Sequence, residues 1–83
     1  MTGRVLYKSS VSHDLKRIDS RNVRRILDEI RGLLGSDPKA GEPLAGEFKG
    51  LFRLRVGHYR VIYALVGDDV LVLRIRHRGK AYE

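Results

Sequence analysis

The segment from Leu51 to Ala64 alternates apolar and basic residues with a period of two, and the alternation breaks once, at Gly57-His58. This pattern predicts two half-buried β-strands joined by a two-residue turn. A turn of that length fixes the register, because the pairs follow by counting outward from it. The expected apolar pairs on one face are Val56–Tyr59, Leu54–Val61 and Phe52–Tyr63. On the other face Arg55 is expected directly opposite Arg60, with Arg53 one step along.

Two arginines opposite each other in a hairpin repel, and stability alone would not select that pair. An anion bound between them would explain it. The alternative is a solvated basic face, where dissolved salt screens the repulsion. The chain carries a net charge of +7, which favours a polyanionic partner: nucleic acid, an anionic membrane surface or an acidic protein. The arginines lie on strands and not on an amphipathic helix, so a membrane partner is not expected.

The rest of the chain predicts a small α+β domain spanning residues 1–83. Residues 4–9 form a first strand, and Ser10 or Ser12 caps a short helix that runs to about Ile18. After a break and a new cap at Asp19-Ser20, an apolar stripe at helical spacing predicts a second helix to residue 34. Residues 36–48 form a loop. Hairpin strands at 51–56 and 59–66 and a last strand at 70–76 complete a β-α-α-β-β-β order.

The last three strands are expected to form an antiparallel meander, with the two helices packed on one of its faces. Leu71, Leu73 and Ile75 are expected to face this core, which requires a three-residue loop or a β-bulge after residue 66. In that register Arg76 pairs with Arg60. The opposite face is then a concave basic surface that carries Arg53, Arg55, Arg60, Arg76 and Arg78.

The sequence argues against several kinds of chemistry. There are no cysteines, so neither disulfides nor thiolate zinc sites are expected. The three histidines show no metal-ligand spacing, no glycine-rich phosphate loop is present, and the serines are explained as helix caps. We therefore expect no metal and no cofactor. No apolar run approaches the ~20 residues of a membrane span, and the cytoplasm is the expected location.

An arginine cluster can bind phosphate and stabilise the negative charge that develops during phosphoryl transesterification. RNA supplies its own nucleophile, the 2′-hydroxyl, so a protein can cleave it without metal by alignment, charge neutralisation and proton transfer. Tyr82 could stack on a base. The alternative is that Tyr82 is a terminal residue without a role.

The segment Phe52-Arg53-Leu54-Arg55-Val56-Gly57-His58-Tyr59-Arg60-Val61-Ile62-Tyr63, followed by His77-Arg78 and Tyr82, resembles the RelE/ParE toxin superfamily of toxin–antitoxin modules. The resemblance covers essentially the whole chain. It implies a RelE-like fold and, for the RelE branch, metal-independent endonuclease cleavage of mRNA in the ribosomal A site. The implied partners are mRNA, ribosomal RNA and a cognate antitoxin. We expect the antitoxin to bind the outer helix surface or the basic sheet face.

Carried over by position, the resemblance implies a catalytic set, and we expect further RNA contacts from neighbouring basic residues. The catalytic set is Arg53, Arg55, Arg60, Arg78 and Tyr82. The further contacts are Lys49, Arg74, Arg76, His77 and Lys80. Lysines stand in the best-known pattern at positions 53 and 55, one of them as general base, and arginine is a poor base. Either Arg55 acts electrostatically here or another group, such as His77, takes the proton. Ala45 stands where the family often has an arginine.

Two other functions are compatible with the sequence. The first is ParE-like inhibition of DNA gyrase by protein–protein binding, in a branch that shares the fold and usually lacks the full basic set. The second is a non-toxic RNA-binding module that uses the same face without cleavage.

Overall fold

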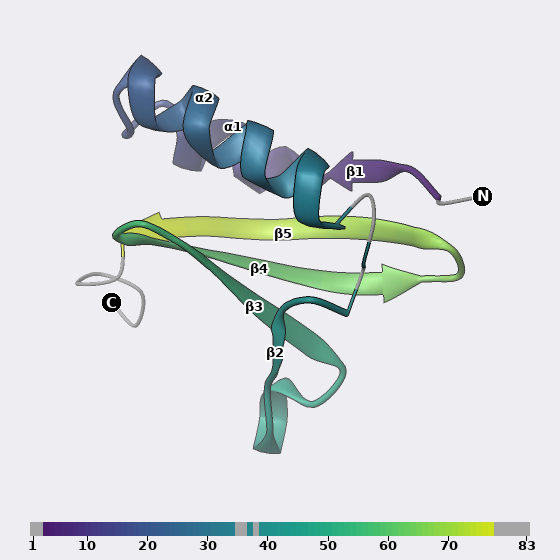
Figure 1. The fold of residues 1–83 in the computed structure, drawn as a ribbon. Helices are drawn as coiled ribbons and strands as arrows, with labels where there is room; N and C mark the ends of the chain where they lie inside the picture. Colours follow the sequence, from purple (N-terminus) through teal and green to yellow (C-terminus); the bar gives the residue numbers. More distant parts are fainter. Residues whose placement is uncertain (1–2, 35–36, 38, 78–83) are drawn as a thin grey trace.

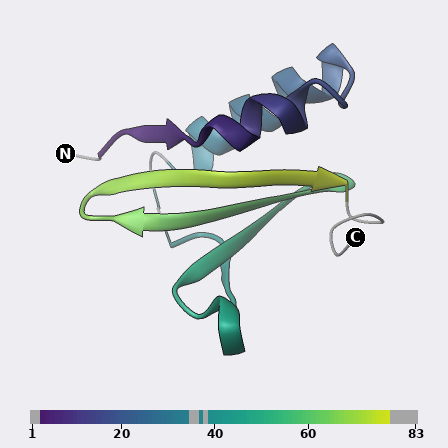
Figure 2. The same ribbon diagram turned by 180° about the vertical axis from the view of Figure 1, so that it is seen from behind.

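A computed structural model describes residues 3–34, 37 and 39–77 of the chain. Figures 1 and 2 show two helices lying over a twisted sheet. The elements in chain order are β1 (Val5–Tyr7), α1 (Ser9–Leu15), α2 (Ser20–Glu29), the π-helical turn η1 (Ile30–Leu34), β2 (Glu42–Pro43), the 3-10 turn η2 (Gly46–Phe48), β3 (Leu51–Val56), β4 (Tyr59–Val66) and β5 (Asp69–His77). The predicted α+β fold is confirmed, and the predicted strands and helices follow in the expected order with one additional short strand, β2.

The sheet is mixed and has the strand order β1-β5-β4-β3-β2. The predicted antiparallel meander is β3, β4 and β5. Two strands extend it beyond the prediction: β1 pairs in parallel with β5, and β2 pairs antiparallel with β3. The prediction of a plain loop over residues 36–48 is therefore wrong at Glu42–Pro43. Proline lacks an N–H and is tolerated at an edge strand, which is where β2 lies.

The predicted register of the β3–β4 hairpin is confirmed. Phe52 pairs with Tyr63, Leu54 with Val61, Arg55 with Arg60 and Val56 with Tyr59. The turn is Gly57-His58, and Gly57 has a φ of 59°. A positive φ at the first position of a two-residue loop suits glycine and matches the twist of the strands.

The β4–β5 pairing contains the expected bulge, but it corrects the predicted core face of β5. The register shifts between Ile62, which pairs with Arg74, and Tyr63, which pairs with Val72, so that Leu73 is the extra residue. The bulge comes four residues into β5, after a two-residue turn, and changes the alternation there. Val70, Val72 and Ile75 are consequently buried, whereas Leu71 and Leu73 are only half-buried.

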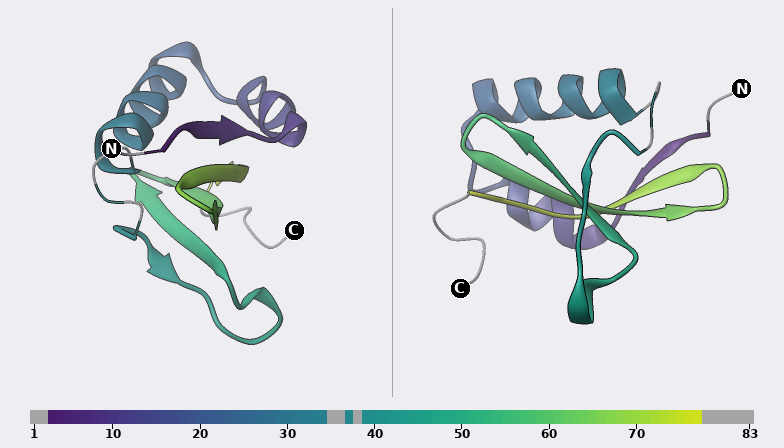
Figure 3. Two further views of the ribbon diagram at one scale, coloured as in Figure 1. Left: turned by 90° about the vertical axis from the view of Figure 1, so that its right-hand side faces the viewer. Right: turned by 60° about the horizontal axis from the view of Figure 1, so that its bottom comes forward.

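Figure 3 shows from two directions that the helices lie over one face of the sheet, and the core lies between them. Its buried side chains are Val11, Ile26, Ile30, Leu54, Val56, Val61, Tyr63, Val70, Val72 and Ile75. The Asp19 carboxylate caps α2 by accepting a hydrogen bond from the Asn22 N–H at 2.8 Å, as the sequence predicted. The side chains of Leu33 and Leu34, which complete the expected apolar stripe, lie outside the description.

Helix α1 covers the part of the β5 edge that β1 leaves open. The Ser10 hydroxyl donates to the Leu73 carbonyl at 2.7 Å, and the Asp14 carboxylate accepts from the Ile75 N–H at 2.9 Å. The helix begins at Ser9 after Lys8, which makes no side-chain cap. The prediction that Ser10 or Ser12 caps this helix is therefore wrong, because the Ser10 hydroxyl serves the sheet edge.

Within the described residues, no helix is long and apolar enough to cross a membrane.

Candidate functional site

The face of the sheet turned away from the helices carries a row of arginines across three adjacent strands. Arg55 on β3 pairs with Arg60 on β4, and Arg60 pairs in turn with Arg76 on β5. Neighbouring strands lie about 4.8 Å apart, so the three side chains leave the sheet close together. We call Arg53, Arg55, Arg60 and Arg76 the basic face. It comprises four of the five arginines that the sequence assigned to this surface.

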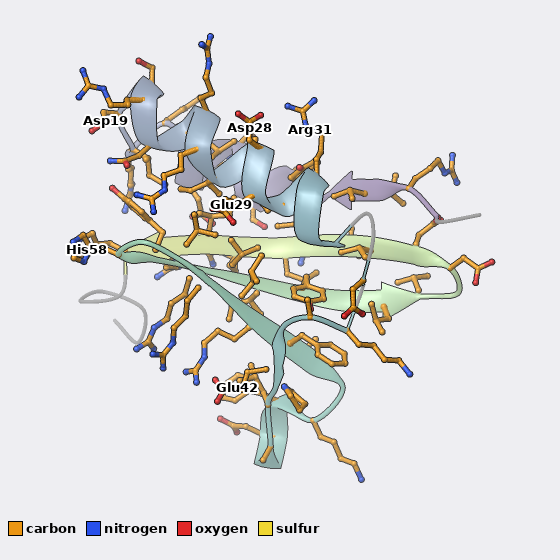
Figure 4. All side chains as sticks on the ribbon, viewed as in Figure 1. Asp19, Asp28, Glu29, Arg31, Glu42 and His58 are labelled. Carbon is orange, nitrogen blue, oxygen red and sulfur yellow. The ribbon has the colours of Figure 1, made fainter. Side chains whose placement is uncertain are left out.

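A carboxylate that sequence reasoning missed lies on this face. Glu42 on β2 pairs across the sheet with Arg53 on β3, and its carboxylate accepts hydrogen bonds from the Arg53 guanidinium, one of them from Nε at 3.1 Å. The Glu42 side chain is 60 % exposed, whereas that of Arg53 is 16 % exposed. Figure 4 shows Glu42 on the side of the sheet away from the helices.

Three arginines of the basic face act on the Glu42 carboxyl. The hydrogen bond and charge of Arg53, followed by the charges of Arg55 and Arg60, lower the pKa of Glu42 from its ordinary value of 4.5. The group is therefore an ionised carboxylate at neutral pH, with a lower proton affinity than a glutamate without these neighbours. No local spacing in the sequence joins Glu42 to Arg53, eleven residues later, because the contact depends on the short strand β2.

A pocket of about 260 Å³ opens beside the opposed arginines and is lined by Arg55, Gly57, Tyr59 and Arg60. At ~30 Å³ per water molecule, that is room for about nine waters, which is enough for a phosphate group and part of a sugar. Among the described residues Arg55 is exposed and no ion pair involves it. Its charge is available to a bound anion.

Arg74 belongs to a structural ion pair. Its guanidinium donates two hydrogen bonds of 3.0 Å to the Asp14 carboxylate, and Arg76 Nε lies 3.9 Å from Asp14. Burial by itself raises the pKa of Asp14, but the hydrogen bonds from Arg74 and the Ile75 N–H, with the charges of Arg74 and Arg76, outweigh it and lower the pKa. The Asp14–Arg74 ion pair links α1 to β5 and holds the Arg74 side chain next to Arg76.

His77, the alternative proton acceptor considered from the sequence, lies in different surroundings from Glu42. The centroid of its ring lies 5.3 Å from that of Tyr59, in an edge-to-face arrangement. It lies 6.2 Å from the ring centroid of His58 at the hairpin turn, and His58 is labelled in Figure 4. His77 lines a pocket of about 610 Å³ that also includes Asp14, Arg17 and Ile18. The strands β4 and β3 lie between β5, which carries His77, and β2, which carries Glu42.

The remaining predicted site residues lie at the margins. Lys49 is exposed directly after η2. Arg78, Lys80 and Tyr82 lie outside the described residues. Within the described part of the chain, no group of His, Asp or Glu side chains is arranged to hold a metal ion.

Comparison with known proteins identifies the family. A family model described as the ParE toxin of the type II toxin–antitoxin system parDE matches residues 5–82. Toxin RelG of Mycobacterium tuberculosis is 30 % identical over 81 residues, which cover 94 % of this chain and 93 % of that protein. The chain therefore belongs to the ParE toxin family, within the RelE/ParE superfamily, and is a toxin of the type II toxin–antitoxin class.

Solved structures agree with this assignment. The toxin–antitoxin complex RelBE2 of M. tuberculosis contains a chain that matches with a TM-score of 0.87 and 28 % identity, over 94 % of this chain and 100 % of that one. The RelE–RelB complex of the archaeon Pyrococcus horikoshii matches with a TM-score of 0.73 and 30 % identity, over 98 % and 100 % of the two chains. The family model carries the ParE name and these relatives carry RelE-type names, so family membership leaves the target open.

Proposed function

We propose that this toxin is a metal-independent, ribosome-dependent mRNA endonuclease of the RelE type that inhibits translation by cleaving mRNA in the ribosomal A site. The observation that supports this most strongly is the row Arg55–Arg60–Arg76, which places like charges side by side on the face opposite the core. Arginines opposite one another across a sheet repel, and the exposed Arg55 in this row suits a bound phosphate. The RelE-type names of the relatives point the same way.

In the proposed reaction the scissile phosphate lies against Arg55 and Arg60, in the pocket that these residues line. The RNA 2′-oxygen forms a bond to phosphorus and the bond from phosphorus to the 5′-oxygen breaks, which leaves a 2′,3′-cyclic phosphate and a free 5′-hydroxyl. Guanidiniums held beside the phosphate before the reaction stabilise the negative charge that develops in the transition state without reorganisation.

The Glu42 carboxylate is the proposed acceptor of the 2′-hydroxyl proton. It pairs with Arg53, and Arg53 precedes Arg55 by two residues on β3, a step of about 7 Å along a strand. A phosphate held at Arg55 would therefore bring its neighbouring 2′-hydroxyl toward Glu42. Arg78 and Tyr82 stay in the proposal by resemblance, Arg78 for charge neutralisation and Tyr82 for base stacking, and solvent water supplies the proton that the leaving 5′-oxygen takes up.

The relatives in the solved complexes are bound to RelB antitoxins, and we propose a cognate antitoxin for this chain. The groove between α1 and α2, about 910 Å³, combines apolar walls at Leu15, Val23 and Leu27 with basic residues at Lys16 and Arg24. An antitoxin segment with apolar and acidic residues would fit this groove. Charge reversal of Lys16 and Arg24 is expected to weaken antitoxin binding without affecting mRNA cleavage.

The test is to express the toxin alone and to map mRNA 5′ ends on translated and untranslated copies of the same message. Cleavage confined to translated copies, and absent for the variant Arg60→Ala, would support the proposal. Growth arrest with intact messages would refute it.

The second candidate function is inhibition of DNA gyrase, which the ParE family model favours. A supercoiling assay with purified protein separates the two functions. Inhibition of gyrase at stoichiometric toxin, unchanged by the Arg55→Ala substitution, would establish this alternative. If gyrase is the target, the wild-type toxin cleaves no mRNA, so Arg55→Ala has no cleavage activity to lose.

A further inference from the structure

Tyr63 on β4 joins the core to the segment that carries Glu42. Its side chain is fully buried, and its ring stacks on that of Phe52 with centroids 5.3 Å apart. Its hydroxyl oxygen accepts a hydrogen bond from the Gly41 N–H at 2.9 Å. A residue at the centre of the sheet therefore contacts the backbone directly before Glu42.

The contact between Gly41 and Tyr63 is close. A Cβ placed on Gly41 would lie 2.4 Å from the Tyr63 hydroxyl oxygen and 3.0 Å from the Arg53 carbonyl oxygen. Both distances are below normal van der Waals contact, and the second obstacle is backbone that cannot rotate away. The absence of a side chain at position 41 is what lets β2 lie against Tyr63 and Arg53.

Among the described residues, strand β2 has few other backbone anchors besides the Glu42–Arg53 side-chain contact. It comprises Glu42 and Pro43 alone and pairs with β3 on one side only. Pro43 donates no backbone hydrogen bond. The next described backbone bond runs from the Leu44 N–H to the Leu51 carbonyl at 2.9 Å. A strand this short depends strongly on each anchor beside it.

We propose that Tyr63 is a positioning residue for Glu42: its hydroxyl, through the Gly41 N–H, holds β2 so that the Glu42 carboxylate stays against Arg53 and beside the Arg55–Arg60 pair. This inference rests on the proposed role of Glu42 as proton acceptor. Tyr63 touches neither RNA nor the reacting atoms in this account, and it acts only through the backbone of β2.

The charged groups that face Glu42 provide a readout for this role. They are Arg53 and Arg55 on β3 and Arg60 on β4, and together they lower the pKa of the Glu42 carboxyl. When β2 is held less firmly, the carboxylate spends less time against Arg53. The pKa of Glu42 then rises toward 4.5, and the acidic limb of the rate profile, where the base becomes protonated, moves to higher pH.

The experiment compares Tyr63→Phe with Tyr7→Phe, which removes the same hydroxyl from an exposed tyrosine on β1 at the far edge of the sheet. In the full-length toxin, NMR follows the exchange rate of the Gly41 amide and the titration of the Glu42 carboxyl. We expect faster Gly41 exchange and a raised Glu42 pKa in Tyr63→Phe, with no change in Tyr7→Phe. An unchanged Gly41 amide and Glu42 titration in Tyr63→Phe would overturn the inference whether or not the protein cleaves RNA.

Cleavage supplies a double-mutant test. Tyr63→Phe is expected to reduce the cleavage rate by about 10- to 100-fold, the effect of a slightly misplaced catalytic group. Glu42→Gln is expected to reduce it by about 10²-fold or more. If Tyr63 acts through Glu42, the double variant is no slower than Glu42→Gln alone. Losses that multiply would show that Tyr63 acts independently and would overturn the inference.

The two failures are distinguishable. A wild-type protein that cleaves no mRNA refutes the proposed function, and the NMR comparison then still decides the positioning role. A Gly41→Ala variant gives a second route, because it displaces β2 while Tyr63 stays intact. It is expected to raise the Glu42 pKa as Tyr63→Phe does, and an unchanged pKa in a folded Gly41→Ala variant would count against the anchor.

Discussion

Arg55 and Arg60 lie directly opposite each other across the β3–β4 hairpin, and they line one pocket on the face away from the core. Two like charges at a cross-strand pair oppose folding, so the pair is best explained by what it binds. We therefore expect Arg55 and Arg60 to contribute nothing to the stability of the fold and to contribute to function by binding an anion.

The first prediction follows from that expectation. Replacing Arg55 by Gln relieves the repulsion, and the free energy of unfolding is expected to stay constant or to rise by up to about 1 kcal/mol. The mRNA cleavage rate is expected to fall by about 10²- to 10³-fold. Chemical denaturation and a cleavage assay on the same preparation measure the two effects. A destabilised Arg55→Gln protein would mean that Arg55 has a structural role instead.

The second prediction concerns Glu42. If it accepts the proton, Glu42→Gln lowers the cleavage rate by about 10²-fold or more and leaves RNA binding similar or tighter, because a negative charge has left the basic face. If Glu42 only occupies Arg53, the same substitution raises both RNA affinity and cleavage. Measuring the dissociation constant and the single-turnover rate for one RNA distinguishes the two roles.

The third prediction concerns Asp14 and stability. The folded state holds the pKa of Asp14 below its ordinary value of 3.8, so the unfolded chain binds a proton there more readily. The stabilisation that the ionised Asp14 carboxylate gives the folded state is therefore fully present above its ordinary pKa of 3.8. It is lost as the pH falls through the folded-state pKa. Asp14→Asn is expected to cost about 2 kcal/mol of unfolding free energy at pH 7.

The pH dependence of this cost is the check. In urea unfolding the difference between wild type and Asp14→Asn is expected to shrink below about pH 4, where the Asp14 carboxylate of the unfolded chain begins to bind a proton, and to be lost as the pH falls through the lower folded-state pKa. A difference that stays constant from pH 7 to pH 3 would contradict the ionic role of Asp14. The exposed ion pair of Asp28 on α2 with Arg31 on η1 is the matched control, and Asp28→Asn is expected to cost less than about 0.5 kcal/mol.

The fourth prediction concerns salt. Binding of single-stranded RNA releases counterions, and the slope of log affinity against log salt falls by about 0.7 for each phosphate contact removed. Arg55→Ala is expected to reduce the slope by about that amount, whereas Arg21→Ala, on the exposed face of α2, is expected to leave it unchanged. Equal changes in both variants would indicate diffuse attraction by the net charge.

The hairpin could be predicted from the sequence because a two-residue turn allows one register only. That register placed Arg55 against Arg60 and Phe52 against Tyr63, and both pairs are present. The pairing of Arg76 with Arg60 was also predicted, once the sequence required a bulge between the last two strands. Local alternation and turn length thus determined most of the basic face.

Other features depend on contacts that local patterns do not encode. The position of the bulge at Leu73 decides which residues of β5 face the core, and both choices present alternating apolar residues. The parallel pairing of β1 with β5 joins segments more than sixty residues apart. Strand β2 has two residues, one of them proline, so no periodicity marks it. Glu42 was missed for that reason, and its contact with Arg53 appears only in three dimensions.

The most direct measurement of the central claim compares two doubly substituted toxins that carry the same net charge. Arg55→Ala/Arg60→Ala removes the opposed pair, and Arg21→Ala/Arg24→Ala removes two exposed arginines from α2. Single-turnover cleavage of mRNA on purified ribosomes is expected to fall by at least about 10³-fold in the first variant and to stay within a few-fold of wild type in the second. Equal rates in the two variants, whether both reduced or both unchanged, would contradict the account.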